Sequence, residues 1–350
     1  MFASQAKCRG FEPHRPLFVI IMKYYFCDEL NNVLSCFHDR IMSCCSGQIG
    51  PVYYEGYRGE KINWDEFRQI KYKAFELLNE RDIDKSPCKN CFFLRERKES
   101  DIISPKFKLI NVSHWTQCNC GCIYCARMLD SKGEISHKLE KSQYYDFLPL
   151  LKELYKEDLL DKENLTAFIQ GGDISVLKEF EPMVKEFLKQ GVKEFYILSN
   201  NIKYQPIIKK LLDKDIVHYV TALDCANREL YKKLKRVDKF NQSVDNLKKY
   251  AKSKNGGKVH VKYILIENLN DNKDEITNFI NLMKRIGISA VEFMIDNKYL
   301  LFTNLDETPL PKHYKDLYLH FEQLCKENNI NMIFWERTKF VVDKYLLEKI

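Results

Sequence analysis

The chain has 350 residues, 45% of them hydrophobic, which is enough for one large domain with a sizeable core and a second, smaller one. Its 56 Lys and Arg residues exceed its 49 Asp and Glu residues and give a net charge of +7. Acidic residues alternate with the basic ones, however, and Lys232, Lys233 and Lys235 are interpreted as a solvated helix face. A basic stripe with interleaved aromatic residues is not evident, so we expect no nucleic-acid partner.

The start of the chain carries no clear structural signal. Residues 1–21 lack helix caps and periodicity, so we expect a disordered or non-native leader and a natural start at Met22. The apolar run Pro16–Met22 is too short to span a bilayer, and no convincing cleavage site follows it. Thirteen cysteines without a secretory leader favour metal ligation over disulfides. We therefore expect a cytoplasmic protein with no membrane partner.

Residues 22–104 form the first predicted unit, a cysteine-rich module. Cys88 and Cys91 have the C-x2-C spacing that fits one edge of a zinc or an iron–sulfur site. Four ligands would close such a site, and Cys27 is an alternative to one of them. The predicted ligands are Cys36, Cys44 or Cys45, Cys88 and Cys91.

Residues 105–300 alternate short β-rich runs with longer segments of helical period. In one such segment Ile276, Phe279, Ile280 and Met283 follow the spacing of a single buried helix face. Alternation of this kind indicates βαβ units around a parallel sheet, and six units make a partial (β/α)6 barrel of the TIM type. The predicted strands are Phe107–Val112, Leu165–Ile169, Glu194–Leu198, Val217–Leu223, Val259–Ile266 and Ala290–Ile295.

A cysteine loop follows the first of these strands. Cys118, Cys122 and Cys125 have the spacing C-x3-C-x2-C. Thiolates this close cannot all pair as disulfides without strain, but they can converge on one soft metal centre. Three cysteines on a cubic iron–sulfur cluster leave one iron open to a small molecule. The other interpretations are a zinc site, including a ribbon shared with Cys88 and Cys91, and incidental buried thiols.

This loop, with Tyr124 before its last cysteine, resembles the cluster loop of the radical SAM superfamily. The resemblance implies a six-unit partial barrel, a [4Fe–4S] cluster and S-adenosylmethionine as cofactors, and a flavodoxin- or ferredoxin-type electron donor. Reductive cleavage of S-adenosylmethionine in that family gives a 5′-deoxyadenosyl radical, which takes a hydrogen atom from the substrate. It also implies that Tyr124 packs near the adenine.

The strand ends carry further resemblances to this family. Gly171, Gly172 and Asp173 resemble its Gly-Gly-Glu motif, which holds the amino group of S-adenosylmethionine, although here an aspartate replaces the glutamate. Ser199 and Asn200, after the third strand, resemble a polar pair near the cofactor. Their alternative role is a helix N-cap.

The fourth strand ends with Thr221 and Asp224, and Arg228 follows. The resemblance implies that Thr221 and Arg228 contact the ribose and carboxylate of the cofactor. Asp224 is a candidate catalytic residue that faces the substrate, or alternatively a helix N-cap. Cys225 is a candidate hydrogen donor or, alternatively, a buried core thiol.

Two further segments complete the predicted organisation. The cysteine-rich module resembles a shortened SPASM or twitch domain with a second iron–sulfur cluster, although such modules usually follow the barrel. This resemblance implies a peptide, a sugar or another small molecule as substrate. Residues 301–350 are predicted to pack on the open side of the barrel, as a helix over Leu310–Lys326, a strand over Ile330–Trp335 and a helical tail.

Two other classes of function fit parts of the pattern. A non-catalytic iron–sulfur electron carrier or sensor would have fully ligated clusters and would not bind S-adenosylmethionine. A zinc-stabilised structural module would hold zinc and no iron. The glycine pair after the second strand favours the enzyme over both.

Overall fold

The structure, a computed structural model, describes residues 24–43, 52–80, 88, 91, 93–126, 143–302 and 305–348. Residues 1–21 and Cys44 therefore lie outside the described residues. The strands are β1 (Tyr25–Cys27), β2 (Val33–Phe37), β3 (Arg40–Met42), β4 (Val52–Glu55), β5 (Leu94–Glu96), β6 (Leu109–Ser113), β7 (Thr166–Ile169), β8 (Glu194–Leu198), β9 (Val217–Ala222), β10 (Val259–Leu265), β11 (Ala290–Ile295) and β12 (Asn331–Ile333).

The helices connect and cover these strands. They are α1 (Asp28–Asn32), α2 (Trp64–Glu80), α3 (Phe147–Lys156), α4 (Phe180–Lys189), α5 (Pro206–Asp213), α6 (Arg228–Lys235), α7 (Phe240–Ala251), α8 (Lys273–Ile286), α9 (Tyr314–Glu327) and α10 (Glu336–Val341), with the short turns η2 (Gly256–Lys258), η3 (Lys298–Phe302) and η4 (Val342–Leu346). None of these helices, within the described parts of the chain, is long and apolar enough to span a bilayer.

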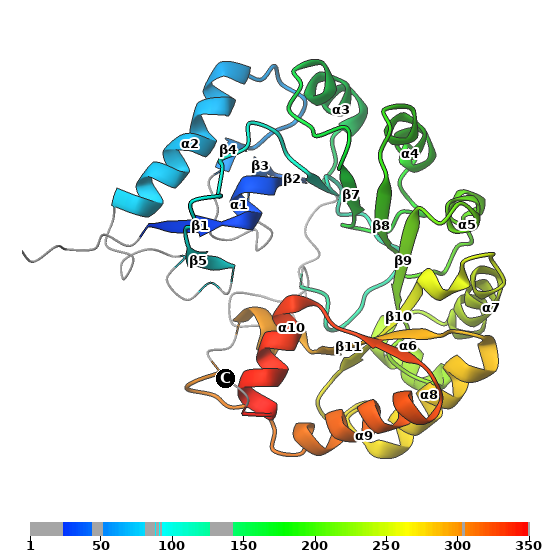
Figure 1. Cartoon of the computed structure of the whole chain (residues 1–350). Coiled ribbons are helices and arrows are strands. Elements are labelled where there is room, and N and C mark those ends of the chain that lie inside the picture. Colours follow the sequence, from blue (N-terminus) through cyan, green and yellow to red (C-terminus); the bar gives the residue numbers. More distant parts are fainter. Residues whose placement is uncertain are drawn as a thin grey trace, which may run out of the picture.

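A mixed α/β fold with a largely parallel sheet results. The order is β12-β11-β10-β9-β8-β7-β6-β2-β3-β4. All neighbouring strands between β12 and β2 in this order are parallel. Each of the six predicted strands is present, and the predicted bounds of Glu194–Leu198 and Ala290–Ile295 are those of β8 and β11. Figure 1 shows this sheet as an arc, with α3, α4, α5, α8 and α9 along its outer side.

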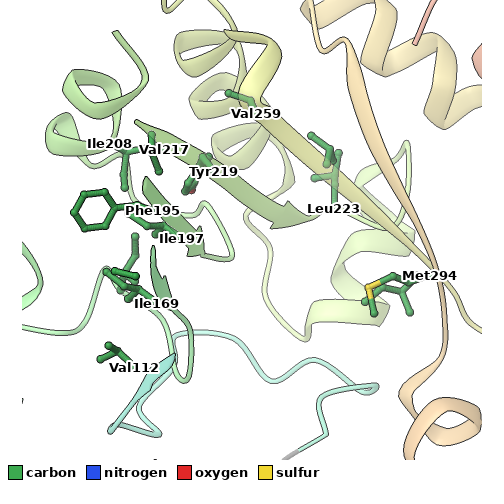
Figure 2. Packing of buried hydrophobic residues seen from close by; sticks show 14 of the residues in the cluster. Val112, Ile169, Phe195, Ile197, Ile208, Val217, Tyr219, Leu223, Val259 and Met294 are labelled. Atoms are coloured by element: carbon green, nitrogen blue, oxygen red, sulfur yellow. The ribbon is translucent and has the colours of Figure 1, made fainter. Parts of the chain in front are cut away.

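Alternation along the strands produces the two faces of this sheet. Successive side chains of a strand point to opposite sides, so every second residue can pack on the helices. Phe195 of β8 packs its ring edge-on against Phe187 of α4, and Tyr219 of β9 lies 4.7 Å from Tyr250 of α7 between ring centroids. Figure 2 shows Phe195 and Val217 on the side of Ile208 in α5. We call this the outer face, and the opposite side the inner face.

The N-terminal part of the chain joins this sheet, which sequence analysis did not predict. β2 lies parallel to β6, with Cys36 opposite Val112, and β3 and β4 continue the sheet in antiparallel order. β1 and β5 form a separate two-stranded antiparallel sheet. The sheet thus crosses the boundary predicted at residue 105, and the division into an N-terminal module and a barrel stays a prediction.

The C-terminal segment returns across the inner face. β12 adds to β11, and α9 packs on the outer face through Phe321, whose ring lies 5.3 Å from that of Phe293. Directly after β12, the ring of Trp335 lies 6.4 Å from that of Phe168 in β7, between centroids. Five places in the strand order separate β12 from β7. This contact across the arc requires a strongly curved sheet.

One buried lysine ties the N-terminal segment to the start of the parallel sheet. Lys71 of α2 donates to the carbonyl oxygens of Asn31 and, at 2.6 Å, of Ser104. Its ammonium also lies 4.4 Å from the centroid of the Phe107 ring. Burial lowers the pKa of Lys71 to about 7, because removing the charge from water penalises the protonated form.

This shift predicts a pH dependence of stability. The usual lysine pKa is 10.5, so between pH 7 and 10.5 the unfolded chain holds a proton that the folded chain has lost. The free energy of unfolding should therefore rise with pH by up to about 1.4 kcal/mol per unit. Urea unfolding at pH 7 and pH 9 measures this rise, and Lys71→Met should remove it. An equal pH slope in both proteins would contradict the assignment.

Candidate active site

Several of the predicted site residues converge at one edge of the sheet. The cysteine loop, residues 118–125, follows β6, and the segments after β7, β8 and β9 lie at the carboxyl ends of neighbouring parallel strands. Ligand sites of parallel α/β proteins gather at this edge. The loop makes hydrogen bonds with residues that follow β7, β8, β9 and β11. The segment that enters the loop makes further bonds with residues after β7.

The glycine pair after β7 holds the segment that enters the cysteine loop. The amide of Gly172 donates to the carbonyl oxygen of Trp115 at 3.0 Å, and the amide of Asp173 donates to that of Gln117 at 2.8 Å. A Cβ atom at position 172 would lie 1.8 Å from the Gln117 carbonyl oxygen. Only glycine fits here, because the two backbones approach so closely.

The Asp173 carboxylate joins the ends of β7 and β8. Its Oδ2 accepts from the hydroxyl of Ser199 at 2.9 Å and from the amide of Asn200 at 2.7 Å. Its Oδ1 accepts from the amide of Ser175 at 2.9 Å, and the side chain is buried. Both carboxylate oxygens are therefore engaged within the chain.

Asn200 reaches the cysteine loop directly. Its side-chain amide donates to the side-chain oxygen of Asn119 and lies 3.6 Å from the sulfur of Cys118. Asn119 in turn donates to the hydroxyl of Ser175 at 3.3 Å. Sequence analysis placed Asn200 near the cofactor, and in the structure it lies beside the first cysteine of the loop.

A buried ion pair anchors the other end of the loop. The Lys235 ammonium lies 2.6 Å from the Asp224 carboxylate, and each side chain is at most 1% exposed. The Tyr124 hydroxyl donates to Asp224 and accepts from Lys235, and the ammonium also lies 4.8 Å from the centroid of the Tyr124 ring. We call Tyr124, Asp224 and Lys235 the anchor triad. Burial alone would lower the pKa of Lys235, but Asp224 and Cys122 hold it above its usual value.

Backbone contacts reinforce this anchor. The amide of Gly121 donates to the carbonyl oxygen of Lys235, and that of Ile123 to the carbonyl oxygen of Leu234, each at 3.0 Å. These are the last carbonyls of α6, which have no partner inside the helix. The cysteine loop thus caps the C-terminal end of α6.

Asp224 has an unusual backbone conformation that fits this role. Its φ is +64°, in the left-handed region, and its Oδ1 accepts from the amide of Ile264 at 2.9 Å. The Asn270 side chain donates to the Asp224 carbonyl oxygen at 2.8 Å. The side chain of Asn297, after β11, donates to the carbonyl oxygen of Tyr124 at 3.0 Å. The turn after β9 is therefore fixed from several strands.

The interpretation of Lys235 as part of a solvated helix face was wrong. Lys232 and Lys233 are exposed, whereas Lys235 is 1% exposed. Sequence analysis also missed Asn270 and Asn297. The helical period does indicate that Lys235 is buried. It lies four residues after Tyr231 and one after Leu234, which are both fully buried.

The thiols of the loop differ in their electrostatics. The Cys120 thiol donates to the sulfurs of Cys118 and Cys122, which raises the pKa of Cys120 and lowers the pKa of its two neighbours. For Cys122 the pKa falls to about 6, because this hydrogen bond and the Lys235 charge outweigh the effect of burial. The thiolate is the form that binds metal. The loop thus favours thiolates at two of the three predicted ligand positions.

The three predicted ligands of the iron–sulfur cluster lie on one loop. Cys118 is exposed, Cys122 and Cys125 are half-buried, and a turn bond from the Cys125 amide to the Cys122 carbonyl oxygen closes the C-x2-C step. Within the described residues, no three side chains stand close enough to ligate a single metal ion. A cluster presents its irons at separate corners, so its thiolate ligands stand farther apart than those of one ion.

Other predicted site residues are not brought to the loop. Thr221 is buried on the outer face of β9, on the same side as Tyr219. Arg228 is exposed and pairs with Asp238 on the surface. The Cys225 thiol is buried, donates to the carbonyl oxygen of Leu223 at 3.4 Å, and has a pKa raised by burial. Their predicted contacts with cofactor or substrate stay predictions.

The N-terminal cysteines fall into two surroundings. Cys36 is fully buried on the outer face of β2, and burial raises the pKa of its thiol. Cys88 and Cys91 form a turn in which the Cys91 amide donates to the Cys88 carbonyl oxygen at 2.9 Å. The pairing of β1 with β5 sets Cys27 opposite Leu94, whose amide bonds to the Cys91 carbonyl oxygen at 3.0 Å. Cys27, rather than Cys36, is therefore the neighbour of this turn.

Comparisons with known proteins agree with this geometry. Residues 112–282 match the Radical SAM superfamily. The molybdenum cofactor biosynthesis protein moc-5 of Caenorhabditis elegans is 24% identical over 197 residues, covering 55% of this chain and 31% of that protein. A GTP 3′,8-cyclase of Clostridium botulinum is 21% identical over 225 residues, covering 64% of this chain and 65% of the cyclase. The chain thus spans less than two thirds of the length of either relative.

A solved structure has a similar fold. Streptococcus suis SuiB, bound to the precursor peptide SuiA, has a TM-score of 0.50 and 11% sequence identity, over 81% of this chain and 56% of that one. The match over residues 112–282 supports the radical SAM superfamily, and the solved structure supports the mixed α/β fold. Proteins of this superfamily are enzymes, and the cofactors of the domain are a [4Fe–4S] cluster and S-adenosylmethionine.

The anchor triad predicts a large effect of one substitution on stability. Lys235→Met leaves the Asp224 charge buried without its partner, which should cost about 3–5 kcal/mol of the free energy of unfolding. Lys233→Met, on the exposed side of the same helix, is the matched control and should change it by less than about 0.5 kcal/mol. Urea denaturation measures both. Similar small losses in the two variants would contradict the role of Lys235.

Proposed function

We propose that the chain is a radical SAM enzyme whose cluster is held by Cys118, Cys122 and Cys125. The observation that carries the proposal is a C-x3-C-x2-C loop fixed at the carboxyl edge of a parallel sheet, in a domain that matches the superfamily. When bound and reduced, the cluster supplies one electron that splits S-adenosylmethionine into methionine and a 5′-deoxyadenosyl radical, which takes a hydrogen atom from the substrate.

The residues around the loop position these cofactors. The anchor triad and the end of α6 fix the last turn of the loop, and Gly172 fixes the segment that enters it. The backbone of Gly171 and Gly172 offers polar groups at close approach to the amino group of S-adenosylmethionine. Asn200, beside Cys118, orients the first ligand and lies near the same cofactor. Asp224, already paired with Lys235, acts as a positioning residue for the loop.

The wider organisation is part of the proposal. The curved sheet is a partial (β/α)6 barrel, extended by β2 on one side and by β12 on the other. A flavodoxin- or ferredoxin-type protein supplies the electron. The substrate is a peptide or a small molecule: among the similar proteins, one is a GTP 3′,8-cyclase and one was solved with a precursor peptide.

We also propose a second metal site in the N-terminal part of the chain. Cys88 and Cys91 are two of its ligands, and the pairing of β1 with β5 favours Cys27 over Cys36 as a third. Cys44 and Cys45, which lie outside the described residues, are candidates for the fourth. A complete set of four thiolates suits electron transfer or structural support.

The first test measures iron, sulfide and cofactor cleavage. Anaerobically reconstituted protein should cleave S-adenosylmethionine when reduced with dithionite, and changing Cys118, Cys122 and Cys125 together to alanine should remove about four irons per chain and abolish cleavage. Cys325→Ala, a buried thiol of α9 outside the cysteine loop, is the control and should keep both. Stoichiometric zinc with little iron would contradict the proposal. Iron without cleavage would favour an electron carrier or sensor.

A second measurement tests the N-terminal site. Cys88→Ala should lower the metal content of the reconstituted chain while cleavage of S-adenosylmethionine persists, because the barrel cluster is separate. Cys36→Ala should leave the metal content unchanged, because this thiol is buried in the hydrophobic core. A loss of metal in Cys36→Ala but not in Cys27→Ala would contradict the ligand set with Cys27. It would support the set with Cys36 that the sequence spacing predicts.

A further inference from the structure

A row of rings crosses the inner face of the sheet below the cysteine loop. Phe168 of β7, Tyr196 of β8 and His218 of β9 are register partners on adjacent parallel strands. The ring centroids of Phe168 and Tyr196 lie 6.1 Å apart at 26°, and those of Tyr196 and His218 lie 4.5 Å apart at 5°. The three rings therefore form a nearly continuous platform.

This platform is less covered than the outer face of the same strands. Phe168, Tyr196 and His218 are half-buried, whereas the alternate residues Ile169, Phe195 and Val217 are fully buried against the helices. Rings that serve only as core are normally covered on both sides. Partly open aromatic faces on the inside of a curved sheet are instead typical of a surface that receives a ligand.

Trp335 faces this platform from the C-terminal segment. It is 39% exposed, and its ring lies 6.4 Å from that of Phe168 between centroids, at an angle of 53°. The Lys262 ammonium of β10 lies 4.2 Å from the centroid of the Trp335 ring. Trp335 therefore connects the ring platform to the charged residues of β10 and β11.

A buried carboxylate beside this lysine has unused hydrogen-bonding capacity. Glu292 of β11 is 2% exposed, and its Oε1 lies 3.4 Å from the Lys262 ammonium. Among the described residues, Oε1 accepts no hydrogen bond. The ion pair with Lys262 is longer than a normal hydrogen bond, and a carboxylate oxygen can accept from two donors, so this oxygen has place for one further donor. A ligand N–H group would supply it.

We propose that Phe168, Tyr196, Trp335, Lys262 and Glu292 bind the substrate through a planar nitrogen heteroaromatic ring of the nucleobase type. This inference rests on the proposed function and identifies the substrate class for the same barrel. Tyr196 precedes Asn200 by four residues, which is about 13 Å along β8. The ring site therefore lies on the inner surface some way below the cysteine loop, where a substrate can face the radical.

The chemistry of these five residues selects this class of ring. The platform and Trp335 offer stacking faces, and stacking on an aromatic side chain contributes about 1–3 kcal/mol per base. The Glu292 carboxylate accepts from a ring or exocyclic N–H group, as acidic residues do at base edges. An aliphatic substrate would leave the ring faces unstacked and would offer the Glu292 oxygen no donor besides Lys262.

Binding can be tested without turnover. The probe is radiolabelled guanosine in equilibrium dialysis against the reconstituted enzyme, with saturating S-adenosylmethionine present to fill the cofactor site. Trp335→Leu should weaken guanosine binding about tenfold or more, and Glu292→Gln should weaken it while keeping the side-chain shape. The control is Tyr72→Leu, an exposed ring on α2, which should bind as the wild type does. N-acetyltryptophanamide and glucose are the competing probes.

The outcomes separate this inference from the proposed function. Guanosine binding that depends on Trp335 and Glu292 supports it. Guanosine binding that is absent, or equal in Trp335→Leu and wild type, overturns it. Capture of N-acetyltryptophanamide or glucose in place of guanosine overturns it as well and assigns the platform to a peptide or a sugar. Cleavage of S-adenosylmethionine by the same preparations is measured in parallel, and its failure alone would contradict the proposed function.

Discussion

The architecture of the site depends on a charge pair that cannot be separated without large cost. Lys235 and Asp224 are both removed from water, so each is tolerated only beside the other. Tyr124 completes their hydrogen bonds and brings the cysteine loop with it. Apart from Ile123 and Tyr124, which pack on the core, the loop consists of short polar and sulfur-containing residues with little apolar surface. Its position is therefore set by this pair, by the end of α6 and by the backbone after β7.

The parallel sheet could be predicted because its signals are local. Strands such as β8 and β11 alternate or concentrate apolar residues within five or six positions, and the helices between them repeat at 3.6 residues. β2 could not be predicted in this way. Its place beside β6 depends on contacts across more than seventy positions of sequence, which no local pattern indicates. Lys235 was misinterpreted for a related reason, because its charge was weighed and its position on the helix was not.

The site itself was predictable in part. The ligands predicted from the cysteine spacing stay a prediction. The order of the strands indicated that Gly172 and Asn200 would lie near the loop, and the structure places them there. The side chain of Asp173 connects two strand ends, which the sequence did not indicate, and the cofactor contact implied by its family resemblance stays a prediction. Hydrogen-bond partners of this kind depend on side-chain direction at turns, which spacing along the chain does not determine.

The position of β2 has a consequence for how the chain can be divided. Because β2 pairs along all five residues of β6, the strand that leads into the cysteine loop is an interior strand with neighbours on both sides. A fragment beginning near residue 105 would turn β6 into an edge, with a row of unpaired amide and carbonyl groups open to other chains. The segment that looks separable by its cysteine content is thus the cover that keeps the catalytic half from self-association.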